Sequence, residues 1–84
     1  MQILYTARFL RSIKKLSVDI REDAIVALEK FEHKKNHRAL KLHKLSGPMQ
    51  KYHAFSINYH YRIVIKLEKG IACCMDIGTH DVYR

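Results

Sequence analysis

The sequence predicts one α+β domain over residues 1–84, with an N-terminal strand and a helical hairpin packed on one face of a twisted antiparallel sheet of about four to five strands. Two observations predict this fold. Apolar residues recur at helical spacing from residue 6 to residue 31, and after about residue 38 they alternate with polar residues at strand spacing. With 48% apolar and 29% charged residues, the composition is that of a small globular domain.

The first part of the chain holds a short strand and two helices. Residues 2–5 (QILY) form the strand. The first helix has an apolar face made of Phe9, Ile13 and Leu16. The second helix has an apolar face made of Ile20, Ala24, Leu28 and Phe31. Ser17 or Asp19 is the N-cap of the second helix, and the short linker between the helices predicts a helical hairpin.

Four strands follow, joined by short loops. The expected strands are residues 40–45 (LKLHKL), 52–58 (YHAFSIN), 61–67 (YRIVIKL) and 71–77 (IACCMDI). The SGPMQ stretch is a loop, and LEKG supplies a glycine turn. Successive strands with short connections favour an antiparallel meander.

Several features of the sequence bear on the compartment. No apolar stretch approaches the roughly 20 residues that cross a bilayer, and the start lacks the shape of a signal peptide. We therefore expect a cytoplasmic protein without membrane contact. Cys73 and Cys74 are adjacent, and neighbours on a strand point to opposite faces, so we expect buried or half-buried thiols rather than a disulfide.

Positive charge is concentrated in one segment. Residues 33–67 hold eight Lys and Arg and no acid, whereas residues 1–32 carry a net +1 and residues 68–84 a net −1. Such a block repels itself unless a polyanion shares the space, and nucleic acid is the commonest polyanion. The alternative is a solvated basic face without a partner. The residues expected to contact RNA are Lys34, Lys35, Arg38, Lys44, Lys51, His53 and Lys66.

Polar side chains of several strands are predicted to converge on the sheet face opposite the helices. Lys41 and His43 share one face of their strand, and Arg62 shares a face with Lys66. The terminal GTHDVYR follows the last strand, and Gly78 permits a sharp turn that folds His80 and Tyr83 back beside this face.

These residue types suit the metal-free cleavage of RNA. A base takes the proton of a 2′-hydroxyl, which attacks the adjacent phosphate, and an acid protonates the departing 5′-oxygen. Histidine suits both proton roles because its ordinary pKa lies near neutrality, and arginine grips two phosphate oxygens at once. No histidine spacing predicts a zinc site, and we expect neither a metal nor another cofactor.

Several polar and aromatic residues have an interpretation that involves no site. We expect His33 and His37 on the solvated surface at the end of the second helix, and Tyr5 in the core. Packing or sheet positions are expected for Tyr52, Tyr59 and Tyr61. For Arg62 the alternative is an ordinary cross-strand ion pair with Asp76.

The chain resembles the RelE/ParE superfamily of bacterial toxins of type II toxin–antitoxin systems. The resemblance covers essentially the whole length and is most specific in KLHKLSG (41–47), YHYRIVIKL (59–67) and DIGTHDVY (76–83). It implies a helical hairpin on a twisted antiparallel sheet. The RelE, YoeB and YafQ-like branches are metal-independent ribonucleases that cut mRNA, commonly in the ribosomal A site of the 30S subunit. A cognate antitoxin neutralises them by wrapping the basic groove.

The resemblance also implies roles for individual residues. Arg62 matches the arginine that stabilises the phosphate, and His80 and Tyr83 match the terminal catalytic residue and its following aromatic. His43 matches a histidine of YafQ-like members, and His60 falls where those members carry an aspartate. The paired lysines of RelE-like members are missing from the third expected strand, residues 52–58 (YHAFSIN), which offers only His53 nearby.

Three functional readings follow. In the first, the protein is an mRNA endonuclease in which His43 or Lys41 is the base, His80 is the acid, Arg62 stabilises the transition state and Tyr83 positions the substrate. In the second, it is a ParE-like toxin that inhibits DNA gyrase, although such toxins generally lack the clustered His, Arg and Tyr residues. In the third, it is a non-catalytic RNA-binding module or a decayed toxin.

Overall fold

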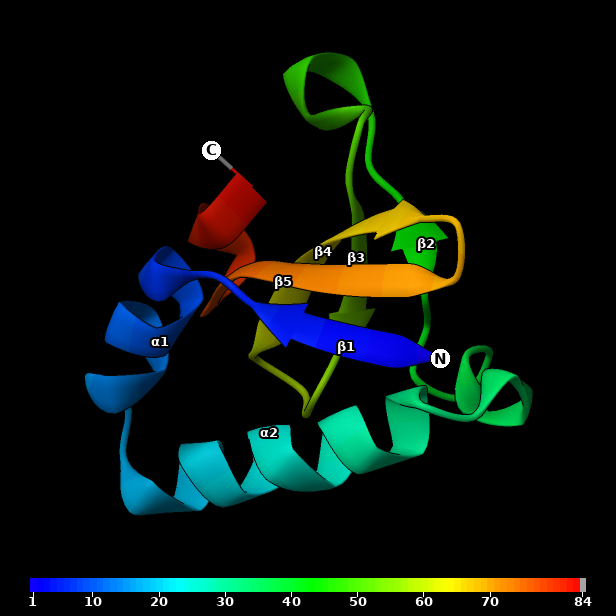
Figure 1. The fold of residues 1–84 in the computed structure, drawn as a ribbon. Coiled ribbons are helices and arrows are strands. Elements are labelled where there is room, and N and C mark those ends of the chain that lie inside the picture. The colour runs from blue at the N-terminus through cyan, green and yellow to red at the C-terminus, as the bar shows by residue number, and fades with distance from the viewer. Residues whose placement is uncertain (84) are drawn as a thin grey trace.

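The computed structural model describes the backbone of residues 1–83 and the side chains of residues 1–82. Two helices pack on a five-stranded sheet (Figure 1). The strands are β1 (Gln2–Tyr5), β2 (His43–Lys44), β3 (His53–Ser56), β4 (Arg62–Glu68) and β5 (Ile71–Gly78). The helices are α1 (Ala7–Lys14) and α2 (Val18–Phe31), with short 3-10 helices η1 (Lys34–Asn36), η2 (Gly47–Met49) and η3 (His80–Tyr83). The predicted α+β fold and single layer of helices are confirmed.

The sheet is mixed because β1 pairs parallel to β5. Strands β2 to β5 form the predicted antiparallel meander, and the strand order is β1-β5-β4-β3-β2. A wholly antiparallel sheet was therefore too simple an expectation. The turn between β4 and β5 has positive φ at both central residues, Lys69 (49°) and Gly70 (79°), which is the hairpin geometry that matches the twist of paired strands.

The predicted strand over residues 40–45 is reduced to the two residues of β2. Lys41 has a φ of 59°, a left-handed conformation that interrupts an extended chain. Leu40 precedes this turn and is buried, so the residue belongs to the core without belonging to a strand.

Helix α1 is fastened to β5 by its N-cap. The hydroxyl of Thr6 accepts a hydrogen bond from the Phe9 N–H (3.1 Å) and donates to the Cys74 carbonyl (2.9 Å). Asp76 makes a second connection, because its carboxylate accepts from Arg8 Nε (3.1 Å) and Ser12 Oγ (2.6 Å). Ser17, one of the two N-cap residues predicted for α2, is the N-cap, and its hydroxyl accepts a hydrogen bond from the Ile20 N–H (3.4 Å).

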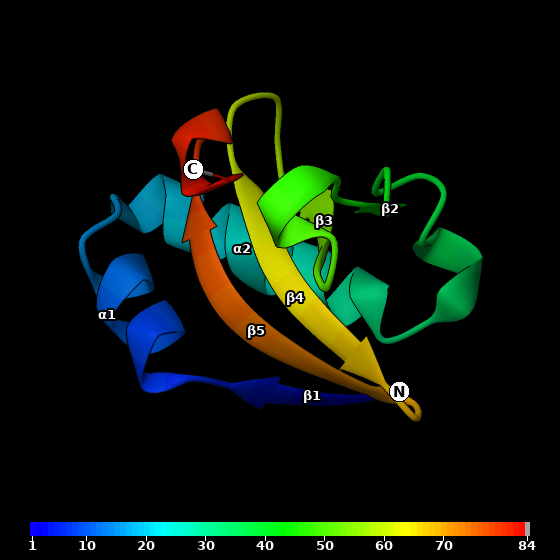
Figure 2. The same cartoon turned by 90° about the horizontal axis from the view of Figure 1, so that it is seen from above.

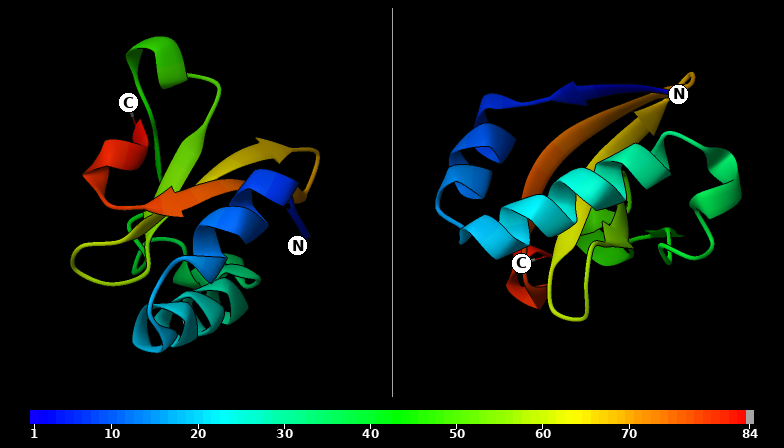
Figure 3. Two further views of the ribbon diagram at one scale, coloured as in Figure 1. Left: turned by 90° about the vertical axis from the view of Figure 1, so that its left-hand side faces the viewer. Right: turned by 90° about the horizontal axis from the view of Figure 1, so that it is seen from below.

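The core lies between the sheet and α2, which crosses one sheet face (Figure 3). Phe31 is fully buried between two rings: its centroid is 4.4 Å from that of Phe55 and 4.3 Å from that of His37, both in stacked orientation. The His37 Nε2–H donates to the Phe31 carbonyl (2.8 Å). His37 was expected on the solvated surface, but this contact makes it a half-buried part of the core.

Two other expectations about side chains have different outcomes. Cys74 is fully buried and Cys73 is half-buried, as predicted, and both thiols are free. Burial, together with the neighbouring Cys73, raises the pKa of the Cys74 thiol to about 12. Tyr5 was expected in the core, yet it is 48% exposed and only flanks Phe9, with a centroid distance of 5.6 Å.

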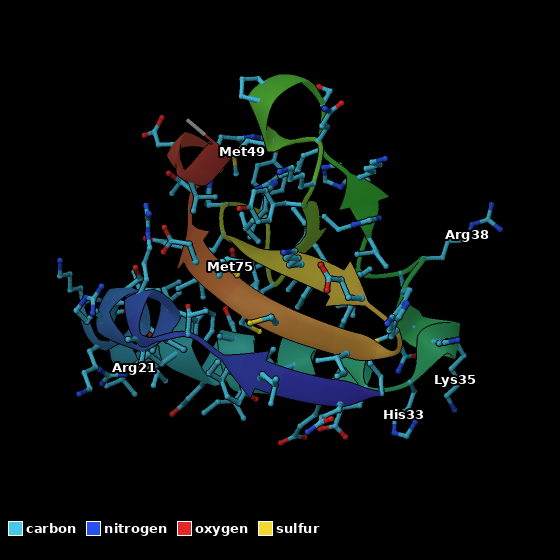
Figure 4. The ribbon with its side chains drawn as sticks, turned by 45° about the horizontal axis from the view of Figure 1, so that its top comes forward. Arg21, His33, Lys35, Arg38, Met49 and Met75 are labelled. Carbon is cyan, nitrogen blue, oxygen red and sulfur yellow. The ribbon has the colours of Figure 1, made fainter. Side chains whose placement is uncertain are left out.

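The sheet face opposite α2 is also covered over its centre. Ala54 and Val64 lie opposite each other on this face, and both are buried. Figure 2 shows the η2 segment and η3 above the sheet, and Met49, labelled in Figure 4, lies beside η3. Met49, Tyr52 and Val82 line a small cavity of about 190 Å³ over Val64. The polar face predicted from the sequence is thus confined to its margins.

His53 lies on the helix-facing side of β3, and not on the opposite face expected for RNA contact. It alternates with buried Phe55 and pairs with Lys44 and Ile65. Its Nδ1 is buried and has no hydrogen-bond partner among the described residues. Burial lowers the pKa of His53 below 6.5, and the nearby Lys44 and His43 lower it further.

We expect Thr6→Val to lower the free energy of unfolding by about 1–2 kcal/mol, because valine keeps the shape but removes the hydrogen bonds of the hydroxyl. Urea unfolding followed by circular dichroism measures the loss. Thr6→Ser, which keeps a hydroxyl, should lose much less. Equal losses in the two variants would show that the cap is not responsible.

Phe31→Ala should lower the free energy of unfolding by about 3–5 kcal/mol, because it leaves a cavity between Phe55 and His37. The same urea experiment applies, with Phe31→Leu as the control that preserves most of the apolar volume. A loss below about 1 kcal/mol for the alanine variant would contradict a central role for this stack.

Acid should destabilise the protein through His53. Its pKa is lower in the folded chain than the ordinary 6.5, so below pH 6.5 the unfolded chain binds more protons. This contribution to stability is complete above pH 6.5 and declines as the pH falls toward the lowered pKa. Melting temperatures measured from pH 7.5 to pH 5 should fall less steeply for His53→Gln than for wild type. The matched control is exposed His33→Gln, which should keep the wild-type slope.

Candidate functional site

A pocket lies where the ends of three neighbouring strands meet at one end of the sheet. In the antiparallel register Ser56 pairs with Arg62, and Arg62 pairs with Gly78, so β3 ends, β4 begins and β5 ends side by side. Figures 2 and 3 show η3 beside the loop that joins β3 to β4. The pocket has a volume of about 670 Å³ and is lined by Ala39, Leu40, Lys41, Ser56, Ile57, Asn58, Tyr59, His60, Arg62, Thr79, His80 and Asp81.

Arg62 lies at the start of β4 and is half-buried. Its guanidinium donates to the His60 carbonyl at 3.2 Å, which orients the side chain beside the pocket. A cross-strand ion pair with Asp76 was one expectation from the sequence. The register excludes it, because Asp76 lies opposite Val64 and binds Arg8 instead. Among residues 1–82, Arg62 forms no ion pair, so its charge is not neutralised by a carboxylate of that range.

The loop between β3 and β4 is held by Asn58. The side-chain oxygen Oδ1 of Asn58 accepts from the backbone N–H groups of His60 (3.0 Å) and Tyr61 (2.8 Å). Its amide nitrogen donates to Asp23 on α2 at 3.0 Å. One side chain therefore both closes the loop and ties it to the helix layer. His60 is exposed on this loop and lines the pocket.

A further part of the lining comes from the segment after β5. The Val82 N–H donates to the Thr79 carbonyl (2.9 Å), which closes the turn of η3 and brings His80 and Asp81 to the pocket. The role of Gly78 differs from the predicted sharp turn. Its φ is not positive, and a Cβ at this position would meet the Cβ of Val82 at 3.4 Å, an ordinary van der Waals contact. Neither the backbone conformation nor the space beside η3 therefore requires glycine here.

The structure brings four of the predicted catalytic residues to one pocket: Lys41, His60, Arg62 and His80. His43 faces the same side of the sheet but does not line the pocket. Its Nδ1–H donates to the Lys41 carbonyl at 2.9 Å, which makes Nε2 the basic nitrogen of the neutral ring. The side chain of Tyr83 lies outside the described residues.

Most of the predicted RNA-contact residues lie away from the pocket. Lys35 and Arg38 project into solvent, as does His33, at the end of the molecule far from η3 (Figure 4). Lys34, Lys44 and Lys51 are exposed, and Lys66 forms an ion pair with Glu68 (3.1 Å) that raises the pKa of the lysine. These positions form a dispersed basic surface rather than one patch.

Sequence reasoning missed several residues of the pocket. Asn58 is one, although its place in a tight connection after a strand was a usable signal, since asparagine commonly closes turns through its side chain. Tyr59 was interpreted as a packing residue, but it is exposed. Asp81 adds one carboxylate to a lining whose formal cations are Lys41 and Arg62. Nothing in the local sequence indicated that Thr79 and Asp81 reach the loop after β3.

The chain shares its fold with several solved structures at low sequence identity. HP0894 from Helicobacter pylori superposes with a TM-score of 0.75 at 14% identity, over 96% of each chain. YafQ from Escherichia coli gives a TM-score of 0.72 at 15% identity, over 98% of this chain and 96% of YafQ. A chain of the YoeB–YefM toxin–antitoxin complex from Staphylococcus aureus gives a TM-score of 0.73 at 14% identity, over 95% and 97%.

Helices long and apolar enough to cross a bilayer are absent from the described part of the chain.

Comparison of the sequence with protein families identifies one family. Residues 18–84, which are most of the chain, match the sequence model of the ParE-like toxin domain. A search of curated proteins found no match. The protein therefore belongs to the family of ParE-like toxin domains and has the fold of the YafQ and YoeB toxins of toxin–antitoxin systems.

Proposed function

We propose that this protein is the toxin of a type II toxin–antitoxin system and acts as a metal-independent endoribonuclease on mRNA. The observation that carries the proposal is the pocket at the ends of β3, β4 and β5, whose lining includes Arg62, two histidines and Lys41. Its volume of about 670 Å³ lies within the usual range for small-ligand pockets and suits one nucleotide with its phosphate.

Each residue has a part in cleavage by a 2′-hydroxyl. His60 and His80 both line the pocket, His60 from the loop after β3 and His80 from η3. Cleavage needs a base and an acid at the same phosphate. We assign His60 as the base that takes the 2′-hydroxyl proton and His80 as the acid that protonates the 5′-oxygen. Lys41 is the alternative base. His43 lies outside the lining, and we place it at the margin of the site.

Arg62 supplies the electrostatic part of catalysis. The negative charge that develops on the phosphate oxygens needs a fixed cation, and the bond to the His60 carbonyl holds the guanidinium in place. Lys41 adds a second cation at the same pocket. The charges of Arg62 and Lys41 would bind the backbone phosphates of an mRNA in the ribosomal A site. The net charge of +8 would attract RNA over a longer range.

A cognate antitoxin is the expected partner. The structure of the YoeB–YefM pair is that of a toxin–antitoxin complex, and its toxin shares this fold. We propose that the antitoxin of this protein presents acidic side chains to the pocket and the neighbouring basic surface. The rival function is inhibition of DNA gyrase, the activity that the resemblance to ParE-like toxins implies.

Loss of the pocket chemistry should abolish toxicity. Induced wild-type protein should stop growth and reduce amino-acid incorporation before thymidine incorporation. The variant Arg62→Ala/His80→Ala should restore growth, since removing one such stabilising group or proton donor lowers the rate by about 10²–10³-fold. The matched control is Arg11→Ala/His33→Ala, which changes the same residue types at exposed positions outside the pocket and should remain toxic.

Two outcomes would contradict the proposal. A folded double variant that stays fully toxic would exclude Arg62 and His80 from the activity. An earlier fall of thymidine incorporation would indicate gyrase as the target. Mapping of mRNA ends after brief induction separates the remaining cases: cuts within reading frames only during translation indicate action on the ribosome, and RNA binding without cuts indicates a non-catalytic module.

A further inference from the structure

Tyr59 is exposed in a way that packing does not explain. It lies in the loop between β3 and β4 and is 88% exposed, more than any other large apolar side chain that the structure exposes. It also lines the pocket that contains Arg62 and His80. A single exposed aromatic residue is ordinary on a protein surface. The position of this ring at the wall of the candidate site is what calls for an explanation.

The backbone that carries Tyr59 is unusually well fixed for a surface loop. The Ile57 N–H donates to the Tyr61 carbonyl at 3.0 Å, and Asn58 accepts from the two N–H groups that follow Tyr59. The link from Asn58 to Asp23 fixes the loop to α2. Because the backbone is already ordered, a ligand that contacts the ring pays only for the side-chain torsions.

The tyrosine ring keeps a face for a ligand. Its contact with His60 is edge-to-face, with a centroid distance of 5.0 Å and an interplanar angle of 83°. Such a contact uses at most one face of the tyrosine ring. The ring therefore has the geometry of a stacking platform next to a histidine and an arginine.

We propose that Tyr59 stacks on an unpaired nucleobase of the RNA whose phosphate lies at Arg62. This proposal rests on the proposed function and adds the form of its substrate. A base in a duplex is already stacked on both faces, so Tyr59 selects single-stranded RNA over double-stranded RNA. Stacking is tolerant of base identity because every base has a π-face, so Tyr59 contributes affinity more than sequence preference.

The test uses the absence of tryptophan from this chain, which has five tyrosines and no Trp. Tyr59→Trp introduces a single tryptophan at the pocket. The probe is a single-stranded 2′-O-methyl RNA of about eight nucleotides, which cannot be cleaved because its 2′-hydroxyls are blocked. Its addition should quench the tryptophan fluorescence. Tyr5→Trp, at a half-exposed position that does not line the pocket, should show little change.

Affinity gives an independent measurement. By fluorescence anisotropy of the labelled probe, Tyr59→Ala should bind about 5- to 150-fold more weakly than wild type, the range expected for one base–aromatic stack. Tyr59→Phe should stay within about twofold of wild type because it keeps the ring. Since Tyr59 is exposed, the alanine variant should keep the wild-type melting temperature.

The outcomes separate this proposal from the function on which it rests. If wild type binds the probe but Tyr59→Ala binds equally well, or a duplex binds as tightly as the single strand, the stacking proposal is wrong and the ribonuclease proposal stands. If Tyr59→Ala binds the RNA probe as wild type does but is no longer inhibited by the antitoxin, the ring contacts the antitoxin instead of RNA, and the stacking proposal is again wrong. If wild type binds no RNA, both proposals fail.

Discussion

The stack of Phe55, Phe31 and His37 is the contact on which the remaining structure depends. It joins the end of α2, the middle of β3 and the turn that leads to Lys41 in one column of rings. Small domains have a net stability of only about 5–15 kcal/mol, so a contact of this size is a large share of the total. The column also fixes the distance between the helix layer and β3, and two walls of the pocket start from these elements.

The pocket is built from connections rather than from regular elements. Strands β3, β4 and β5 bring their ends together, but the chemistry lies on the loop after β3, the first residue of β4 and the turn after β5. The connections have their own hydrogen bonds: Asn58 donates to Asp23, the Val82 N–H donates to the Thr79 carbonyl, and the Lys41 carbonyl accepts from His43. Rigid elements position the candidate site and loops carry it, a common division in proteins.

Periodicity was sufficient to predict the helices and most strands, because one face of each is buried. The apolar faces that include Phe9 and Leu28 are the faces that pack. The uninterrupted run Ile63-Val64-Ile65 also signalled a strand covered on both sides, a sign that was available and not used. The parallel pairing of β1 was not predictable, since a strand's own alternation does not specify its neighbour. The left-handed Lys41 was equally hidden, because lysine carries no conformational signature.

The site was predictable in its residue types and only partly in its geometry. Arg62 and His80 line one pocket because the β4–β5 register and η3 bring them there, and neither follows from local sequence. His43 illustrates the limit. Its alternation with leucines placed it on the correct face, but the shortening of β2 leaves it outside the lining.

The parallel pairing of β1 with β5 has a consequence for biosynthesis. Thr6 bonds to the backbone of Cys74 across a separation of 68 residues, so the earliest strand to be synthesised waits for the latest one. Contacts this distant in sequence make folding slow, and chains emerge from the ribosome from their N-terminus. A nascent chain therefore lacks a completed sheet until β5 has left the exit tunnel. Because Thr79, His80 and Asp81 line the pocket, a chain that still lacks β5 and the turn after it cannot assemble the pocket.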